Sequence, residues 1–142
     1  MKTIFKYRKE LSRISGEIYR PIGEVVLKTD ANEIKVAMYI DSGADITVIP
    51  RVLGEALGFK VEDSKIMELT GIGNAKVPII IKKVKMRIGE QEFDARVAWC
   101  LEEDVPPLLG RIDVFNRFKI TFDEENKEII FEWKNNKAKP NL

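Results

Sequence analysis

Residues 36–49 read VAMYIDSGADITVI, two apolar segments joined by a short acidic loop. Both segments are rich in β-branched residues, which indicates two strands. Asp41 follows the first strand directly, so its apolar neighbours predict a buried carboxylate, which is unfavourable unless it is hydrogen bonded. Ser42 offers a hydroxyl for that purpose, and Gly43 lets the backbone fold closely enough for its N–H to reach a carboxylate oxygen.

Two ordinary interpretations of this loop are open on its residues alone. An isolated Asp-Ser-Gly is most often an Asx-type turn, in which Asp41 only bonds nearby amides. A hard-cation site would use Asp41 and Asp45, but such sites usually collect more oxygen ligands than this loop offers. We therefore expect no metal ion here, and the sequence indicates no cofactor.

The composition narrows the chemistry that the chain can carry. Its 142 residues are 44% hydrophobic and 33% charged, as in one globular domain with a substantial core. Histidine is absent, and there is one cysteine. A Ser-His-Asp triad, a Cys-His pair, an internal disulfide and a Cys/His zinc cage are therefore excluded. Carboxylates, lysines or hydroxyls must carry any catalysis.

The charge and hydropathy patterns bear on partners and location. The 24 basic and 23 acidic residues leave a net charge of +1, which gives no electrostatic reason to expect nucleic acid as a partner. No apolar run approaches the roughly 20 residues of a membrane helix. Residues 1–6 also lack the features of a secretory signal. The sequence thus predicts no membrane association and a cytoplasmic location.

From Ile22 onward, short β-type segments are separated by Gly, Pro, Asp and Asn, so the chain is predicted to be mainly β. The predicted strands are Gly23–Lys28, Ile34–Ile40, Thr47–Ile49, Phe59–Leu69, Lys76–Ile88, Glu92–Trp99, Lys119–Phe122 and Glu128–Trp133. A turn at residues 123–126 is expected to join the last two strands. Two short helices are predicted, Arg51–Leu57, which Gly58 would end, and Arg111–Phe118.

Three parts are expected along the chain. Residues 1–20 are basic and ambiguous between strand and helix, and form an N-terminal extension that is a strand or an arm. Residues 21–133 form the folded domain, and residues 134–142 form a flexible polar tail. Trp99 and Cys100 are expected to pack in the core or an interface, because no histidine is present to activate the thiol.

Two further segments contain informative residues. Thr70-Gly71-Ile72-Gly73-Asn74 lies between two long strand patterns, and its glycines suit the tip of a hairpin that opens and closes. Taken alone, the segment would be a plain hairpin turn. Pro107-Leu108-Leu109-Gly110-Arg111 places an apolar pair before Gly-Arg, and Arg111 taken alone would be a solvated surface arginine.

In this order and approximate spacing, the three elements resemble the retropepsin-like aspartic proteases, the family of retroviral proteases and their cellular relatives. Asp41-Ser42-Gly43-Ala44-Asp45 followed by Thr47-Val48-Ile49 resembles the active-site signature, residues 70–74 the flap tip, and residues 107–111 the second signature. The resemblance implies a closed β-barrel over residues 21–133, with a flap hairpin and one or two short helices. It also implies that Gly110 supports the catalytic loop and that Arg111 forms an ion pair with Asp45.

The resemblance further implies a homodimeric aspartic endopeptidase. Such chemistry needs two carboxylates that share one proton beside a water molecule, and the single Asp-Ser-Gly means that a second copy must supply the other. The catalytic residues would be Asp41, Ser42 and Gly43, and the substrate a peptide or protein with hydrophobic side chains. The substrate-binding residues would be Ala44, Asp45, Val48, Leu69, Gly71, Ile72, Gly73, Pro106 and Leu108. The alternative is a catalytically silent module of the same fold that dimerises or binds peptides.

Overall fold

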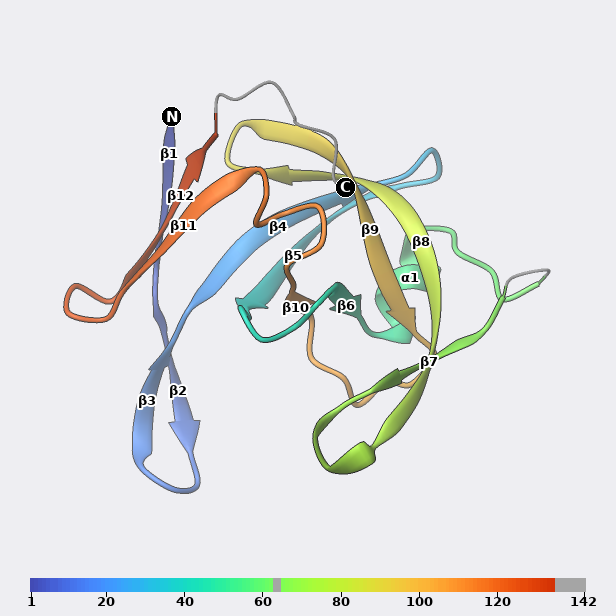
Figure 1. Ribbon diagram of the computed structural model, residues 1–142, viewed down its shortest axis with the longest axis horizontal. Coiled ribbons are helices and arrows are strands. Elements are labelled where there is room, and N and C mark those ends of the chain that lie inside the picture. Colours follow the sequence, from blue (N-terminus) through green and yellow to red (C-terminus); the bar gives the residue numbers. More distant parts are fainter. Residues whose placement is uncertain (63–64, 135–142) are drawn as a thin grey trace.

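The computed structural model describes residues 1–62 and 65–134, most of which form β-strands, so the mainly β prediction is confirmed (Figure 1). The strands are β1 (Lys2–Lys6), β2 (Arg8–Ser12), β3 (Gly16–Arg20), β4 (Ile22–Lys28), β5 (Glu33–Ile40), β6 (Thr47–Ile49), β7 (Met67–Thr70), β8 (Lys76–Ile88), β9 (Gln91–Cys100), β10 (Leu108–Leu109), β11 (Phe118–Asp123) and β12 (Glu128–Trp133). One α-helix, α1 (Arg51–Ala56), and one 3₁₀ turn, η1 (Ile72–Asn74), complete the described elements.

Six strands close into a barrel. Their order is β4-β5-β10-β6-β9-β8, and β8 returns to pair with β4 from Val26 opposite Arg87 to Lys28 opposite Lys85. β7 pairs with β8 outside this ring. The short β10 lies between β5, to which it is parallel, and β6, to which it is antiparallel. A segment from late in the chain is thereby fixed beside the loop that joins β5 to β6.

The main hydrophobic core fills the barrel. Its fully buried side chains include Leu27, Met38, Met86 and Val97, from four of the six barrel strands. The alternation of buried and exposed residues along the first part of β9 is the pattern of a strand with one face in the core. Burying each such side chain contributes about 1.5–3 kcal/mol, so closure of the barrel is driven mainly by its interior.

Helix α1 covers one end of this core. Trp99 is 1% exposed, and its indole N–H donates to the Arg51 carbonyl at 3.0 Å. The helix approaches so closely because residue 54 is glycine, where a Cβ would overlap the Trp99 ring. Gly58 follows the helix with φ +86, the left-handed conformation that ends it as predicted.

The two ends of the chain form a second, three-stranded sheet in the order β1-β12-β11. Its inner face meets the barrel through a cluster of aromatic rings with centroids 5.1–5.9 Å apart: Phe5, Phe93, Phe118, Phe131 and Trp133. Four of these five ring pairs are edge-to-face, and such pairs add about 0.5–1.5 kcal/mol each beyond burial. Residues 1–20 thus consist mostly of the strands β1, β2 and β3, and β1 belongs to this sheet. Of the tail predicted over residues 134–142, residues 135–142 lie outside the described part of the chain.

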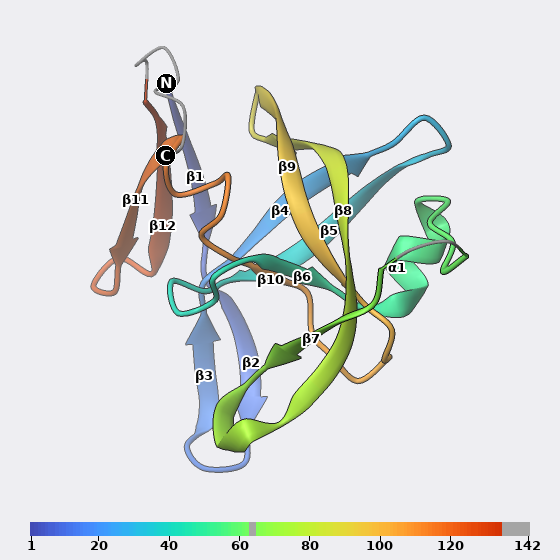
Figure 2. The ribbon, with the colours of Figure 1, turned by 45° about the vertical axis from the view of Figure 1, so that its right-hand side comes forward.

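Two hairpins project from the same end of the molecule in both views (Figures 1 and 2). One is β2–β3, paired from Arg8 opposite Arg20 to Ser12 opposite Gly16. The other joins β7 to β8, with η1 at its tip. The two hairpins come from distant parts of the sequence. The loop that contains Asp41 follows β5, which pairs with β4.

The strand predicted over Phe59–Leu69 is largely wrong. Only Met67–Thr70 pairs as a strand, and residues 63–64 lie outside the described part of the chain. Phe59 and Val61 instead pack on the main core from an irregular segment, with the Phe59 ring 5.6 Å from that of Trp99. The apolar side chains of Phe59 and Val61 therefore belong to an irregular segment that covers the main core, and not to a paired strand.

The helix predicted over Arg111–Phe118 is also wrong, because the segment forms successive turns. The Val114 N–H bonds the Arg111 carbonyl at 3.1 Å, as in a helical turn. Asp113, however, has φ +66, a conformation that a right-handed helix does not include. Its carboxylate accepts three hydrogen bonds of 2.9–3.1 Å from Arg96, one from the backbone and two from the guanidinium. This long-range contact overrides the local helical spacing.

Replacing Asp113 with Asn is expected to lower the free energy of unfolding by about 1 kcal/mol at neutral pH, because a charge-assisted contact to a half-exposed arginine is lost. Asn tolerates the left-handed backbone, so strain does not confuse the result. Arg96 hydrogen bonds hold the pKa of the Asp113 carboxyl below its usual range. The stabilisation is therefore complete above the unfolded-state pKa of about 3.9 and is lost as the pH falls through the lower folded-state pKa.

Urea unfolding of both proteins between pH 2 and pH 7 measures this effect. Asp94→Asn is the matched control, because it removes an exposed ion pair with Lys85 at 2.7 Å and is expected to change stability much less. An equal effect of the two substitutions, or a difference that grows as the pH falls, would contradict the role assigned to Asp113.

Candidate active site

Asp41 occupies the first position after β5 and is held by the backbone on both sides. Its N–H donates to the Leu109 carbonyl at 3.0 Å, and its own carbonyl accepts the Ala44 N–H at 3.2 Å. The Gly43 N–H donates to Asp41 Oδ1 at 2.9 Å, as the sequence predicts. The side chain is half-buried rather than fully buried, so its carboxylate is both oriented and accessible.

Ser42 plays a different local part from the one expected. Ser42 is exposed, and no hydrogen bond from its hydroxyl to Asp41 is present among the residues that the structure describes. The Asx turn to Gly43 alone supplies the local compensation of the Asp41 charge. The hydroxyl of Ser42 remains accessible from outside the protomer.

The segment after β10 braces the Asp41 loop from its other side. The Arg111 N–H donates to the Ala44 carbonyl at 2.9 Å, and the Ile112 N–H to the Asp45 carbonyl at 2.8 Å. The Gly110 N–H donates at 3.1 Å to the hydroxyl of Thr47, a wholly buried residue. These three bonds fix the loop to a chain segment more than sixty residues away in sequence.

The ion pair expected between Arg111 and Asp45 is not present in the described part of the chain. Arg111 instead donates from Nη1 to the Ser42 carbonyl at 3.2 Å, and its guanidinium lies 5.0 Å from the centre of the Phe115 ring. Asp45 is exposed. Arg111 still contacts the loop, but through a backbone carbonyl of the turn rather than through a second carboxylate.

Several predicted substrate-binding residues share a small hydrophobic cluster. Val48 is buried there with Ile79, and Leu69 and Leu108 pack against it while remaining partly exposed. This cluster is separate from the barrel core and brings β6, β7, β8 and β10 together. It forms an apolar surface next to the Asp41 loop. Half-buried Ala44 is part of that loop.

The predicted tip residues form a tight turn at the end of the β7–β8 hairpin. The Gly71 N–H donates to the Ala75 carbonyl at 2.7 Å, and Gly73 has φ +74, a left-handed conformation that glycine adopts without strain. Ile72 is fully exposed, at 101% of its reference surface. The Ile72 side chain is therefore uncovered in this protomer, and no hydrogen bond joins residues 71–73 to Asp41 in the described part of the chain.

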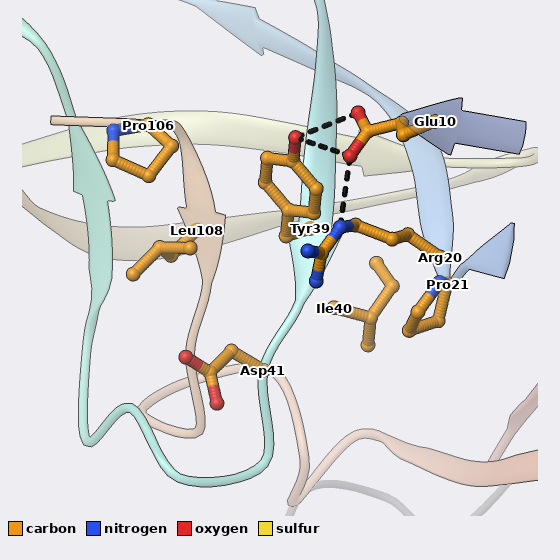
Figure 3. Close-up of a pocket in the computed structure, with 8 residues that line it drawn as sticks. All are labelled: Glu10, Arg20, Pro21, Tyr39, Ile40, Asp41, Pro106 and Leu108. Atoms are coloured by element: carbon orange, nitrogen blue, oxygen red, sulfur yellow. Dashed lines mark hydrogen bonds and ion pairs between the residues drawn. The ribbon is translucent and has the colours of Figure 1, made fainter. Parts of the chain in front are cut away.

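A pocket of about 460 Å³ lies beside Asp41 (Figure 3). Its apolar lining is Pro21, Ile40, Pro106 and Leu108, and its polar lining is Glu10, Arg20, Tyr39 and Asp41. Of the predicted site residues, Asp41, Pro106 and Leu108 meet here. Figure 3 shows the Asp41 carboxylate toward the Leu108 side of the pocket, away from the other polar residues.

Sequence reasoning missed the three other polar residues. The Tyr39 hydroxyl donates to Glu10 Oε2 at 2.7 Å, and Arg20 Nε forms an ion pair with Glu10 Oε1 at 2.9 Å. The bond to Glu10 and burial raise the pKa of Tyr39 above its ordinary value. Tyr39 was detectable, because it precedes Asp41 by two residues and so shares a face of the strand. Glu10 and Arg20 carry no comparable signal in the sequence.

Other chemistry has little support among the described residues. No group of three or more Asp, Glu or Cys side chains lies close enough to hold a metal ion in residues 1–62 and 65–134. Burial raises the pKa of the Cys100 thiol, which is fully enclosed, so the reactive thiolate is disfavoured. Among the described helices, none is long and apolar enough to span a bilayer.

The sequence of this chain matches a known family over most of its barrel. Residues 27–111 match the family model described as aspartyl protease. That range covers more than half of the chain and includes the Asp41 loop, the β7–β8 hairpin and residues 108–111.

Two curated proteins are similar over a similar range. UBA domain-containing protein Mud1 from Schizosaccharomyces pombe is 26% identical over 112 residues, which is 78% of this chain and 33% of that protein. DNA damage-inducible protein 1 from Phaeosphaeria nodorum is 24% identical over 118 residues, which is 82% of this chain and 26% of that protein. The chain thus spans a third or less of the length of these relatives.

Two solved structures share the fold. A retropepsin-like aspartic protease from Rickettsia conorii has a TM-score of 0.65 at 18% identity, covering 92% of this chain and 98% of that one. EIAV protease, solved with the inhibitor HBY-793, has a TM-score of 0.52 at 20% identity, covering 65% and 82%. The predicted retropepsin-like barrel is therefore confirmed as a fold.

Replacing Gly110 with Ala is expected to destabilise the protein by about 3 kcal/mol or more, because the new methyl group has no room. A Cβ there would overlap the carbonyl of Ile46 and lie 2.8 Å from the Thr47 nitrogen, and both neighbours are backbone. Thermal unfolding followed by circular dichroism measures the loss.

Gly71→Ala is the matched control for this substitution. Its nearest neighbour would be the Ala75 carbonyl oxygen at 3.8 Å, and its φ of −105 suits alanine. The control is expected to unfold within a few degrees of the original protein. A Gly110→Ala protein as stable as Gly71→Ala would show that the loop does not depend on this close approach.

Proposed function

Because this chain belongs to the aspartyl protease family, we propose that it is a peptidase in which Asp41 activates the water that attacks a peptide bond. The position of Asp41 is the observation that carries this proposal. Its carboxylate accepts the Gly43 amide at 2.9 Å, is half-buried and lines a pocket large enough for a substrate side chain. A group fixed in this way can hold a water molecule without reorganising during the reaction.

The proposed enzyme is a two-fold symmetric homodimer. Hydrolysis between two carboxylates requires that one be ionised and the other protonated, and two like groups about 3 Å apart share a single proton for electrostatic reasons. The sequence contains Asp-Ser-Gly once, at residues 41–43. The second carboxylate of the proposed dyad is therefore Asp41 of the other copy, with exposed Ser42 of each protomer next to the symmetry axis.

In the proposed reaction, the ionised Asp41 takes a proton from water while the water oxygen attacks the peptide carbonyl carbon. The protonated Asp41 gives its proton to the carbonyl oxygen, which produces a tetrahedral diol. The diol then collapses: the ionised carboxylate takes a proton from one hydroxyl, the protonated carboxyl gives its proton to the nitrogen, and the C–N bond breaks to leave a carboxylic acid and an amine. The dyad again holds one proton, and no covalent enzyme intermediate or histidine is needed.

The surrounding surfaces suit an extended peptide with apolar side chains. The cluster with Val48, Leu69 and Leu108 adjoins the Asp41 loop, and Pro106 lines the same pocket as Asp41. We assign the β7–β8 hairpin the role of a flap, with Gly71, Ile72 and Gly73 at its tip and Ala44 and Asp45 at the base of the cleft. The exposed Ile72 would then be covered only when substrate or the second copy is present.

Asp41→Asn is expected to abolish cleavage of a mixed peptide library at every pH from acid to neutral, because the water loses its base. Asp30→Asn is the control, since Asp30 is exposed in the β4–β5 turn and outside the pocket. Mass spectrometry of the digests measures cleavage. Cleavage that survives Asp41→Asn would contradict the assignment, and peptide binding without any turnover would favour the silent module.

Mixing tests the shared dyad separately. Equal amounts of the original and Asp41→Asn proteins, allowed to exchange subunits, are expected to retain about a quarter of the activity of the same total amount of original protein, since both subunits must carry Asp41. Protomers that act alone would retain about half, which would rule out a dyad shared between copies.

A further inference from the structure

Another pocket lies where β4 and β8 separate at the edge of the barrel. Their pairing ends at Lys28 opposite Lys85, so the part of β8 before Lys85 does not pair with β4. The chain bends there through residues 29–32 into β5, on the side of the barrel that carries α1 (Figures 1 and 2). This bend, residues 57–59 after α1, and β8 line a pocket of about 450 Å³. It shares no lining residue with the pocket beside Asp41.

The lining of this pocket is rich in lysine. Its charged side chains are four lysines and two aspartates: Lys28, Lys82, Lys83, Lys85, Asp30 and Asp94. At neutral pH they leave an excess of two positive charges, although the whole chain has a net charge of only +1. Lys83 and Lys85 are both exposed and are two residues apart on β8, so they lie on the same face of the strand. Positive charge is therefore concentrated at this pocket.

Two of the lysines, Lys28 and Lys83, have no ion-pair partner in the part of the chain that the structure describes. Lys28 lies directly opposite Lys85. Lys83 lies opposite Arg96, whose guanidinium is already bound to a carboxylate. Like charges that face each other on neighbouring strands destabilise a sheet, so this arrangement becomes more favourable when an anion is bound between them.

The neighbouring carboxylates do not neutralise these two lysines. Asp94 pairs with Lys85 at 2.7 Å. The hydrogen bond from Lys85 lowers the pKa of Asp94, and the charge of Lys83 adds to this effect without forming an ion pair. Glu33 lies opposite Lys28 on β5, but among the described residues the two form no ion pair, and Glu33 does not line the pocket. The charge of Lys28 and Lys83 is thus available to a ligand.

A phosphoryl group fits this arrangement. Lysine binds phosphate as a point charge, and ammonium groups from two strands can contact several oxygens of one anion. The excess of two positive charges matches a phosphate dianion, whereas a carboxylate would neutralise only one of them. We propose that this pocket binds a phosphoryl group, either free or carried by a peptide, through Lys28 on β4 and Lys83 on β8. The proposal goes beyond the peptidase function and does not depend on it.

Titration calorimetry with pyrophosphate, in a low-salt buffer at pH 7 that contains no other phosphate, tests the proposal. The original protein is expected to bind, and Lys28→Gln and Lys83→Gln are each expected to weaken binding about tenfold. Lys35→Gln is the matched control, because Lys35 is an exposed lysine of the same barrel that does not line this pocket. It is expected to bind as the original protein does.

A phosphoserine peptide and its unphosphorylated form distinguish the two sources of the phosphoryl group. Binding of the phosphorylated peptide with no binding of pyrophosphate would assign the site to modified peptides, and binding of pyrophosphate alone would assign it to a free phosphate compound. Equal binding of both peptides without pyrophosphate binding, no binding of any probe at about 10 mM, or equal weakening by Lys35→Gln would overturn the proposal.

Two further measurements locate the site and control for folding. Lys28→Gln and Lys83→Gln are expected to change Tm by less than about 2 °C, since both lysines are exposed. On titration with pyrophosphate, the amide NMR signals of residues 29–31 and Gly58 are expected to shift. Shifts confined to other parts of the chain would overturn the assignment. Peptide cleavage is not used in these measurements, so their failure would leave the peptidase function intact.

Discussion

The insertion of β10 between β5 and β6 is the constraint on which the rest of this structure depends. Gly110 approaches the backbone at Ile46 and Thr47 so closely that no side chain fits, and its N–H bonds the buried Thr47 hydroxyl. This contact closes the barrel at the strand pair that carries the Asp41 loop. It also leaves the loop with backbone bonds at Asp41, Ala44 and Asp45, so the carboxylate is placed by main chain rather than by flexible side chains.

The same constraint explains the layout around the loop. Because β10 lies beside β5, Leu108 is opposite Tyr39. The pocket is therefore bordered by an apolar side chain from β10 and a polar side chain from β5, and Asp41 lines it as well. The N-terminal hairpin then packs onto Tyr39 through Glu10 and adds Arg20 to the wall. The chain thus combines a carboxylate held by the main chain with a wall of distinct charge, and Ile72 at the tip of the β7–β8 hairpin is exposed.

Features fixed by local chemistry could be predicted from the sequence, and features fixed by distant contacts could not. The bounds of β8, the end of α1 two residues before Gly58 and the Gly43 bond to Asp41 follow from alternation, glycine geometry and Asx turns. The predicted helix at residues 111–118 is wrong because Arg96 holds Asp113 in a left-handed turn. The predicted partner of Arg111 is wrong because a carbonyl of the turn lies within its reach. Glu10 and Arg20 reach the pocket only through the packing of a hairpin, which no local pattern reveals.

The central claim is that one folded domain carries half of an active site. The most direct measurement is the specific activity as a function of protein concentration, with the mass of the species followed by sedimentation in the same samples. The account predicts that specific activity rises as monomers become dimers and is constant once the protein is fully dimeric. Specific activity that stays constant down to concentrations at which only monomers sediment would contradict it.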